Sequence, residues 1–600
     1  MRRRQWLCSP ALGLGLGSMD AAAAAAPDKT LRIAFKAAET GFDPARISDG
    51  YSRAVTAHIF EALYDYDPLA RPVRIRPLTA AALPEVRDNF RHYTIELRRG
   101  IFFTPDPAFG GRARELVAAD YVYSFKRLMD PALRSPMMPF VQTAGMLGLD
   151  ALREEALRSG HFDYEREIPG LRATGRYTLE IRLAQPRPRL IERLAGNDIF
   201  GAVAHEVVQH WGEAIDAHPV GTGPFVLARW SRGSRILLQR NPHYRERYLD
   251  AQAASDDAEG QALARQLQGR RLPLLDAVDI RIIEENQPRW LAFLKGELDL
   301  LGPPGDGIPA DFISQAVQHG ELSAPLRAQG LQLKRQLNAD SELIFFTMSH
   351  PVVGGLQPER VALRRAISLG MDVPRHLALV RKGQGVPAHS PLVPHTSGYD
   401  PHFKSEMGQF DPARARALLD AWGWRDRDGD GWREQPDGRP LVLEVATTPT
   451  QSARQTDELW RINMKRIGLN VRFKTANFGD HLKAARAGQL MIWGFSVSSD
   501  VPDGLAALAR YHGPQAGSQN VARVALPELD ALYEQLQALP DGPQRNALFH
   551  EAKRLAVAWV PYKIVSHSVS NDLAQPWVRG FRRPLFGSDY WQYLDMVPRA

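Results

Sequence analysis

Short runs of alternating apolar and polar residues recur along the chain. They predict β-strands, because successive side chains of a strand point to opposite faces of a sheet. Other segments carry apolar residues three or four positions apart, the spacing of one face of an α-helix. The strand-like runs are residues 31–35, 93–97, 178–183, 235–238 and 441–445, and the helix-like segments include 55–63, 288–298 and the set Tyr121, Phe125 and Leu128. The predicted fold class is therefore mixed α/β.

The clearest single pattern lies between residues 453 and 475. Apolar residues at helical spacing predict a helix over 453–467, and Gly468 supplies the left-handed residue that commonly ends one. Residues 469–473 then alternate as a strand. A helix is thus predicted to lead directly into a strand.

The next segment extends this pattern to a β-α-β unit. A polar helix is predicted over 480–488, followed by an apolar strand over 490–495. Such a unit contains two parallel strands, and ligands of open α/β sheets bind beyond the carboxyl ends of these strands. This rule places Trp493, Phe495 and Asp500 beside a predicted crevice.

Three further segments predict a helix start, a turn and an exposed insertion. Asp411-Pro412 is predicted to start a helix, with Asp as N-cap and Pro at the first helical position. Residues 221–225 are too rich in glycine for a helix and predict a tight turn before a strand. Residues 251–268 lack a sustained apolar face and predict an exposed insertion.

Length and composition indicate a globular chain of several units. It has 600 residues, of which 44% are hydrophobic and 24% charged, whereas one hydrophobic core rarely serves more than about 250 to 300 residues. The formal net charge is +7, but the arginines are dispersed and do not interleave with aromatics, so no nucleic-acid partner is predicted. No apolar run after residue 26 approaches the roughly 18 to 20 residues that span a bilayer.

Residues 1–26 are predicted to be an export signal. Arginines at the start precede a weakly apolar stretch and a run of alanines suited to cleavage. Arg3-Arg4 also fits the twin-arginine pattern, so a Tat-like and a plain secretory signal both remain open. Either route predicts export from the cytoplasm. The single cysteine, Cys8, lies inside this segment, and the mature chain is predicted to have no disulfide.

The chain lacks the motifs of the common enzyme classes. It contains no Gly-x-Ser-x-Gly elbow, no phosphate-binding loop ending in Lys-Ser/Thr and no Cys/His cluster. His205 and His210 are five residues apart, whereas a zinc-protease helix needs histidines four apart. No enzymatic activity and no cofactor are predicted, and a secreted hydrolase is the rival interpretation from another class.

One acidic segment has two interpretations. Asp426, Asp428 and Asp430, followed by Gly431, repeat the first half of a calcium-binding loop. The twelfth position is Asp437, where such a loop usually has a bidentate Glu. We favour an Asp/Gly-rich turn and keep the three aspartates as an alternative structural calcium site.

Asp500 also has two interpretations. It follows the predicted strand that contains Trp493 and Phe495, and two serines precede it. Its carboxylate either stabilises a turn by bonding to nearby backbone amides or awaits a cation of a ligand in a cleft.

The order of several segments resembles the family 5 extracellular solute-binding proteins, which are dipeptide and oligopeptide receptors of ABC importers. The resemblance covers essentially the whole mature chain. The segments that carry it are ETGFDP (39–44), HIFEALY (58–64), YTIELRRGIFF (93–103), DYVYSF (120–125), PVGTGPF (219–225) and RNPHY (240–244).

The resemblance implies a two-lobed periplasmic-binding-protein fold of class II-like type. Its lobes are linked by a hinge of two crossing strands, and the first lobe carries an extra domain. The implied first lobe is discontinuous, the additional domain is inserted into it, and the second lobe is continuous. The boundaries are 28–73, 196–338 and 571–600 for the first lobe, 74–195 for the additional domain and 339–570 for the second lobe.

The resemblance also implies a function and a site. A small ligand, a peptide, would be captured between the lobes of a monomeric receptor and delivered to a membrane permease with its ATPase subunits. Asp500 would pair with the ammonium of the peptide, and the walls would be Trp493, Phe495, Glu39, Thr40, Gly41 and Phe42.

The ligand itself stays open at this point. The chain has Val501 where the family usually has an aromatic residue after the aspartate. Because the scaffold resembles receptors for several kinds of cargo, haem, a metal chelate or a sugar remains the alternative ligand.

Overall fold

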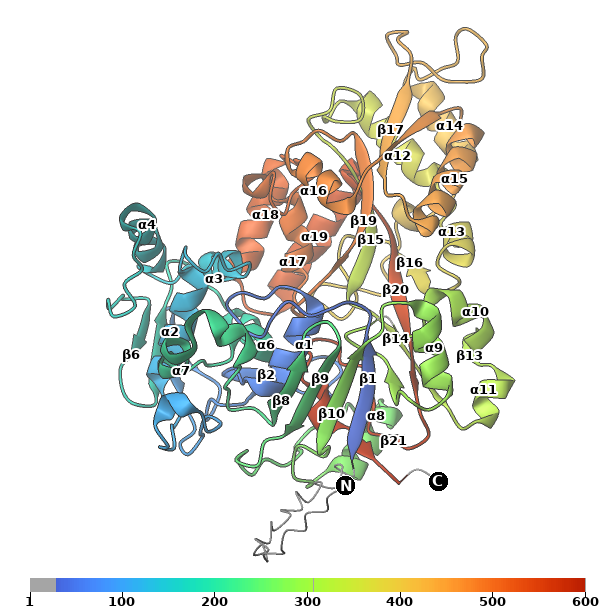
Figure 1. Ribbon diagram of the computed structural model, residues 1–600. Coiled ribbons are helices and arrows are strands. Elements are labelled where there is room, and N and C mark those ends of the chain that lie inside the picture. The colour runs from blue at the N-terminus through green and yellow to red at the C-terminus, as the bar shows by residue number, and fades with distance from the viewer. Residues whose placement is uncertain (1–28, 306, 599–600) are drawn as a thin grey trace, which may run out of the picture.

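The computed structural model describes residues 29–305 and 307–598. In Figure 1 the lower and upper parts of the molecule are built around different sheets. We call residues 29–338 and 571–598 lobe I and residues 339–570 lobe II, following the predicted boundaries, which stay a prediction. The predicted export signal lies outside the described residues.

Lobe I contains a four-stranded sheet next to the start of the described chain. Its strand order is β1 (Thr30–Phe35), β10 (Ala277–Ile282), β9 (Arg235–Arg240) and β8 (Phe225–Ser231). Strands β1 and β10 are parallel and the other neighbours are antiparallel. Leu31, Ile33 and Phe35 are at most 4% exposed, as alternation predicts, and the strands predicted at 31–35 and 235–238 are confirmed.

A second four-stranded sheet lies in the part of lobe I that was predicted as the additional domain. All its neighbours are antiparallel. Its order is β4 (Glu85–Arg87), β5 (His92–Glu96), β7 (Thr178–Arg182) and β6 (Leu171–Ala173). Its core also includes Leu63, Tyr64 and Val207 from outside residues 74–195, so the additional domain packs continuously onto the rest of lobe I.

The helices and small strand pairs of lobe I surround these two sheets (Figure 1). The helices are α1 (Gly50–Ile59), α2 (Ala118–Met129), α3 (Met138–Ala144), α4 (Leu149–Ser159), α5 (Leu190–Arg193), α6 (Asn197–Phe200), α7 (His205–Trp211), α8 (Ala258–Leu267), α9 (Asn286–Leu294), α10 (Ile313–Ala316) and α11 (Ala324–Ala328). The strand pairs are β2 (Tyr64–Tyr66) with β3 (Ile75–Pro77), β12 (Val317–Gln318) with β13 (Glu321–Leu322), and β21 (Val578–Arg579) with β22 (Asp595–Met596).

Lobe II contains most of an eight-stranded mixed sheet. The main path is β11 (Leu300–Leu301), β20 (Tyr562–Ala574), β15 (Asp340–Phe346), β19 (Ile492–Ser498), β17 (Val442–Thr447) and β18 (Asn470–Thr475), while β14 (Gln332–Leu337) and β16 (Gly385–Pro387) also pair with β20. Strands β11, β14 and the end of β20 carry this sheet into lobe I. Because β17 is parallel to both β18 and β19, β18 and β19 are parallel to each other. The predicted β-α-β unit is thereby confirmed.

Helices cover both faces of this sheet, and β15 shows why. Leu343 and Phe345 point to one face and Ile344 and Phe346 to the other, and all four are buried. Both faces therefore need an apolar cover. The first face packs against α16 (Phe478–Arg486), α17 (Leu505–Leu508), α18 (Pro527–Ala538) and α19 (Pro543–Trp559), and the second against α12 (Pro358–Gly370), α13 (Val373–Leu379), α14 (Pro412–Ala421) and α15 (Gln451–Arg466).

Two connections join the lobes. The chain passes from β14 into β15 with only two residues between them. It returns along β20, whose residues 569–574 pair with β14 and whose residues 562–568 pair with β15 and β16. Figure 1 shows β20 in red running through both halves of the molecule.

Two predicted elements have different limits in the structure. The helix predicted over 55–63 ends at Ile59. The reason is a close backbone approach: a Cβ atom at Gly221 or Gly223 would lie 2.0 or 2.6 Å from the Ile59 carbonyl oxygen, and the Gly223 amide donates to that oxygen. The helix predicted over 288–298 ends at Leu294, since Gly296 has a φ of 71°.

The prediction for residues 251–268 was partly wrong. This segment contains the helix α8, with Asp257 as its N-cap. Leu267 is buried, and Asp257 forms an ion pair with Arg582 near the C-terminus. These long-range contacts have no counterpart in the local apolar pattern.

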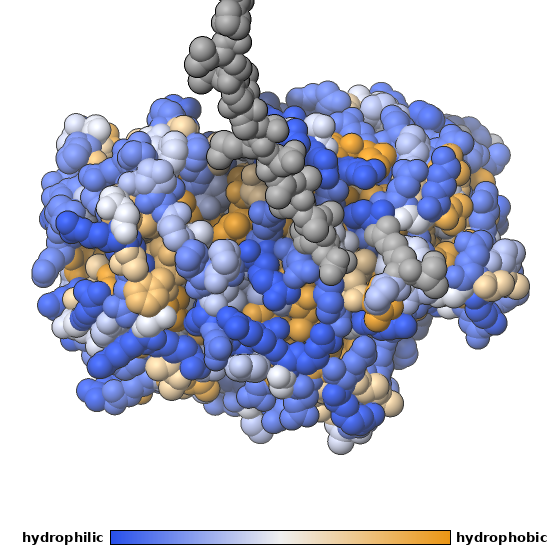
Figure 2. All heavy atoms as spheres, turned by 60° about the horizontal axis from the view of Figure 1, so that its bottom comes forward, coloured by the Kyte–Doolittle hydropathy of each residue, from blue (hydrophilic) through white to orange (hydrophobic). Residues whose placement is uncertain are grey.

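The surface in Figure 2 is predominantly hydrophilic, and apolar residues form small separate patches on that face. A broad contiguous apolar patch would indicate a protein or membrane partner. This face shows no such patch.

A buried ion pair fastens the segment after β1 to the additional domain. The two η nitrogens of Arg127 on α2 donate to the two carboxylate oxygens of Asp43 at 2.8 Å each. Their side chains are only 2% and 0% exposed. Such a pair is worth little against an apolar replacement of both partners, but removing Arg127 leaves the buried Asp43 charge with only the more distant Arg46, 3.6 Å away.

We therefore expect Arg127→Met to lower the free energy of unfolding by about 3–5 kcal/mol, because Asp43 loses its bidentate partner. Calorimetric melting temperatures of the variant and the parent protein measure this. Arg554→Met is the control, since it removes an exposed arginine paired with Glu551, and it should leave the melting temperature unchanged. Equal melting temperatures for all three proteins would contradict the role of the buried pair.

Candidate ligand-binding site

A cavity of about 370 Å³ lies where two parallel strands of lobe II separate. Strand β17 pairs with β19 only through Val445 and Ala446, and β19 then continues to Ser498. The cavity is lined by residues of both strands at this point, including Trp493 and Phe495. Its position agrees with the rule that open α/β sheets bind ligands beyond the carboxyl ends of their parallel strands.

One wall of the cavity is a face of α15. Ala453, Asp457, Trp460 and Asn463 line it at intervals of three or four residues, as one face of a helix requires. Asp457 accepts a hydrogen bond from the Thr447 hydroxyl at 2.9 Å. Burial raises the pKa of Asp457, against the opposing effect of that hydrogen bond.

Asn463, in the same wall, has a side-chain oxygen that lacks a hydrogen-bond donor within the described part of the chain. It is 4% exposed, and its buried Oδ1 has no hydrogen-bond partner among the described residues. A buried amide oxygen without a donor costs on the order of 1–3 kcal/mol. The cavity therefore presents an acceptor that a ligand or a water molecule can satisfy.

The lining also contains a carboxylate, Glu342, whose charge is balanced by neighbouring groups. Glu342 on β15 lies 3.0 Å from His376 Nε2 and 3.6 Å from Arg381 Nε, and it accepts from the Ser566 hydroxyl. Burial alone would raise the pKa of Glu342, but the hydrogen bonds and charges of these partners lower it below its usual value. Glu342 is thus held ionised inside the wall.

Asp500 lies outside this cavity, at the boundary between the lobes. Its Oδ2 is 3.8 Å from Nη1 of Arg53 on α1, and its side chain is 56% exposed. Arg53 also lies 2.5 Å from Asp198, through its Nε. Partial burial raises the pKa of Asp500, Arg53 lowers it and Asp198 raises it further. A carboxylate of lobe II therefore faces a cation of lobe I that already has a closer partner.

Residues Glu39 to Phe42 are engaged in contacts of their own. Glu39 is 3% exposed and accepts from the indole N–H of Trp230 and the amide of Gly233. The Phe42 ring packs 4.8 Å from that of Trp230. The hydroxyl of Thr40 donates to Asp49 at 2.6 Å. None of residues 39–42 lines the lobe II cavity, so their role as walls stays a prediction.

Of the seven predicted site residues, the cavity brings together only Trp493 and Phe495. Asp457 and Asn463 were missed, although their spacing from Trp460 on the predicted helix would have placed them on its inner face. Arg53 and Asp198 were also missed. No sequence pattern could have found these two, because their neighbour Asp500 lies more than 300 positions away.

A second contact between the lobes centres on Arg189. Its Nη1 lies 2.5 Å from Asp541 and its Nε 3.5 Å from Asp503, and Nη2 donates to the Pro502 carbonyl at 3.2 Å. Asp503 is held in addition by Arg545 through two hydrogen bonds. Arg189 belongs to lobe I and the other four residues to lobe II, so this cluster links the two lobes.

The acidic loop of lobe II has four carboxylates together. Oxygens of Asp426, Asp428, Asp430 and Glu434 all lie within 4.8 Å of one another. Backbone amides already donate to each of these side chains, as in the bonds from Gly429 and Gly431 to Asp426, from residue 430 to Asp428, from residue 432 to Asp430 and from residue 427 to Glu434. The loop is thus held by its own hydrogen bonds, which supports the favoured interpretation as a turn.

Residues 74–519 match the family described as bacterial extracellular solute-binding proteins, family 5 Middle. The chain belongs to this family. The predicted resemblance is thereby confirmed.

Two curated relatives illustrate the range of ligands named in the family. Di/tripeptide-binding protein 2 of Pseudomonas aeruginosa is 24% identical over 580 residues, which cover 95% of each chain. Heme-binding protein A of Haemophilus influenzae is 24% identical over 567 residues, which cover 92% of this chain and 89% of that one.

Two solved structures have the same overall fold as this chain. DppA of Helicobacter pylori in complex with the peptide STSA has a TM-score of 0.68 and 20% identity, covering 94% of this chain and 98% of its own. NikA of Brucella suis in complex with Fe(III)-EDTA has a TM-score of 0.72 and 18% identity, covering 95% and 100%. The predicted two-lobed α/β fold is confirmed. Within residues 29–305 and 307–598, no helix has the length and apolarity needed to span a membrane.

The Arg189 cluster leads to a prediction about lobe closure. Arg189→Met removes the contacts to Asp503, Asp541 and the Pro502 carbonyl, while Arg545 still neutralises Asp503. We expect the equilibrium to shift towards a more open form by about 1.5–3 kcal/mol, the usual net value of a hydrogen bond to a charged group. The radius of gyration from small-angle scattering of the ligand-free protein should increase. Arg172→Met, at an exposed position of β6, is the control, and identical scattering curves would contradict the prediction.

For the acidic loop we expect calcium to have little effect, because backbone amides already hold its carboxylates in a turn. Dialysis against a chelator and later addition of calcium chloride should leave the melting temperature unchanged. A calcium-dependent rise that disappears in Asp428→Asn would instead establish the alternative, a structural calcium site.

Proposed function

We propose that this protein is the periplasmic receptor of an ABC importer and that its ligand is a peptide captured between the two lobes. The observation that carries the proposal is the cavity at the diverging ends of β17 and β19, whose wall strand β19 leads within two residues to Asp500 at the lobe boundary. A ligand that reaches from the cavity to Asp500 would contact both lobes.

The ligand would bind by main-chain and terminal interactions. Beyond residue 493, β19 no longer pairs with β17, so its free edge can accept an extended peptide as an added strand. The ammonium of that peptide would meet Asp500, whose present cation, Arg53, is 3.8 Å away and is already neutralised by Asp198. Trp493 and Phe495 supply apolar contact on one side.

Closure is the mechanism that this arrangement supports. A ligand that binds both lobes shifts an ensemble of open and closed forms towards the closed form. A membrane permease with its ATPase subunits would then recognise the closed receptor, and no covalent chemistry is required. This proposal includes the permease and ATPase partners and a monomeric receptor. It also includes export by residues 1–26 through a Tat-like or plain secretory signal.

Haem, a metal chelate or a sugar is the alternative cargo. Heme-binding protein A and NikA with Fe(III)-EDTA, both similar to this chain, are named for such ligands. An absorbance band of haem, or metal in the purified protein, would favour this alternative. Native mass spectrometry of freshly purified protein identifies what it carries.

The test of the peptide proposal is titration calorimetry with a panel of di- to pentapeptides. Asp500→Asn should weaken binding by about a hundredfold or more, because the ammonium would be left without its counter-charge in a closed cleft. Asp256→Asn, an equal change of charge at an exposed position of lobe I, should bind like the parent protein. Unchanged affinity of Asp500→Asn would refute the role of Asp500, and absence of binding for the whole panel would refute the peptide ligand.

A further inference from the structure

A second hollow lies entirely within lobe I, away from the proposed peptide site. It has a volume of about 640 Å³. Its lining comes from the β2–β3 region, from the residues after β5 and from residues 245–252, and it shares no residue with the cavity of lobe II. Six of its lining residues are arginines: Arg74, Arg76, Arg98, Arg99, Arg245 and Arg247. We call it the arginine recess.

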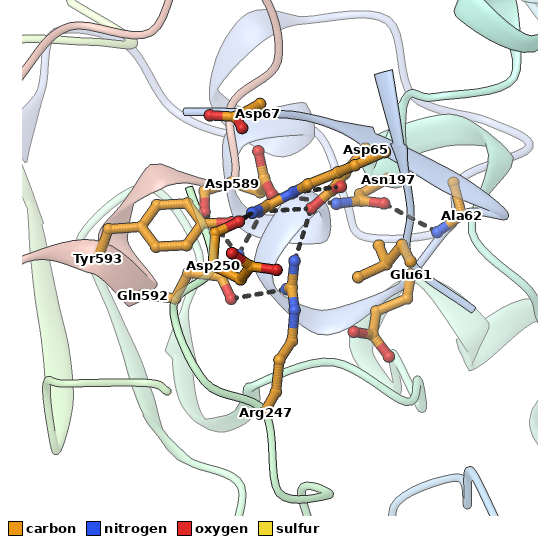
Figure 3. A network of polar contacts seen from close by, with 12 residues as sticks. Glu61, Ala62, Asp65, Asp67, Asn197, Arg247, Asp250, Asp589, Gln592 and Tyr593 are labelled. Carbon is orange, nitrogen blue, oxygen red and sulfur yellow. Dashed lines mark hydrogen bonds and ion pairs between the residues drawn. The ribbon is translucent and has the colours of Figure 1, made fainter. Parts of the chain in front are cut away.

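The guanidinium groups of Arg76 and Arg247 are both held by one buried carboxylate, that of Asp65. Arg76 donates to both oxygens of Asp65, at 2.8 and 3.0 Å, and Arg247 donates to one of them at 2.7 Å. The Arg76 Nη2 also donates to the Tyr593 hydroxyl, and the Arg247 Nη1 to the Gln592 side-chain oxygen. Figure 3 shows Arg247 pointing towards Asp65, with Gln592 and Tyr593 on one side of it.

Arg245 is fixed in the same way by Glu61, whose side chain is 2% exposed. Glu61 also accepts hydrogen bonds from Tyr244 and Thr222. The three inner guanidinium groups therefore hold defined positions before any ligand arrives. A ligand would not have to order them, which lowers the entropic cost of binding.

The outer three arginines have no acidic partner. Among the described residues, no carboxylate lies within ion-pair distance of Arg74, Arg98 or Arg99. Arg98 donates only to the Ala80 carbonyl, at 3.0 Å. Burial lowers the pKa of Arg98, and repulsion from Arg245 and Arg247 lowers it further. Positive charge is thus incompletely neutralised at the mouth of the recess.

The acidic residues of the lining do not fill this role. They are Asp67, Glu246 and Asp250, half the number of the arginines. Asp67 accepts from the amides of Leu69 and Ala70, and Glu246 is 3.6 Å from Arg271. Asp67 and Glu246 therefore interact with groups other than the six arginines. Single unpaired arginines are ordinary on a protein surface, but convergence of six on one hollow, three of them preset, indicates a binding site.

We propose that the arginine recess binds a small, multiply charged oxyanion that carries phosphate or carboxylate groups. The planar fork of a guanidinium group matches two oxygens of either group, and such paired hydrogen bonds are strong and directional. The inner arginines supply the fixed donors and Arg74 and Arg98 the uncompensated charge, while the Arg99 guanidinium lies over the Tyr177 ring, 5.2 Å from its centroid. Because the recess is separate from the lobe II cavity, the anion binds without a peptide present.

The test is titration calorimetry of the full protein at low ionic strength with two probes, pyrophosphate and citrate. We expect one probe or both to bind, and Arg98→Gln to weaken that binding by about tenfold or more, the value of one hydrogen bond between charged groups. Arg158→Gln is the matched control, because it removes an exposed arginine of α4 that has the same charge. It should bind like the parent protein.

Binding of pyrophosphate alone would assign the phosphate class, and binding of citrate alone the carboxylate class. Absence of binding by both probes would overturn the proposal, as would equal weakening in Arg98→Gln and Arg158→Gln. If Arg98→Gln fails to fold, Arg74→Gln on the same rim replaces it in the comparison.

Discussion

The continuous pairing of β20 is the constraint on which the two-lobed structure depends. Every residue from 562 to 574 belongs to this strand, and it pairs with β11 and β14 at one end and with β15 and β16 at the other. A strand that is part of both lobes keeps them at a fixed distance along its axis. Bending across the sheet is easier, and the pairing of β15 with β20 already shifts register between Glu342 and Leu343. The lobes can therefore rotate about this region without separating.

Electrostatics supplies the second link between the lobes. Arg53 and Arg189, both in lobe I, reach Asp500, Asp503 and Asp541 of lobe II. These contacts stabilise the arrangement of the lobes that this structure has. Arg53 and a ligand ammonium would also compete for Asp500, which makes the affinity for small cations lower than the carboxylate alone would give.

The two hollows differ in a way that follows from their location. The cavity of lobe II lies between a helix and the ends of parallel strands, so apolar side chains such as Trp493 line it together with a few polar groups. The arginine recess lies where the additional domain meets the rest of lobe I, and its floor is built from buried pairs such as Arg247 with Asp65. Paired charges can be buried there because each carboxylate holds more than one donor. The pairs also join the C-terminal Tyr593 to the first third of the chain.

Local physics determined much of this protein. Alternation identified β1, β5, β7, β9 and β17 within about two residues of their limits, and Gly468 and Asp411 marked a helix end and a helix start where the structure has them. The order of these elements placed a crevice beside Trp493, where the cavity lies. These successes share one reason, namely that period, caps and turns act between residues close in sequence.

Only the tertiary structure decided which charges meet. Asp500 faces Arg53, Asp503 is shared by Arg189 and Arg545, and six arginines from three segments of the chain line one recess. The end of α1 at Ile59 is likewise set by Gly221 and Gly223, more than 160 positions away. These contacts join residues that are remote in sequence. The local sequence pattern cannot identify such partners, because they meet only when the whole chain folds. The sequence thus determined the family, the elements and the edge of the sheet where the cavity lies, while the packed lobes decided which side chains line it.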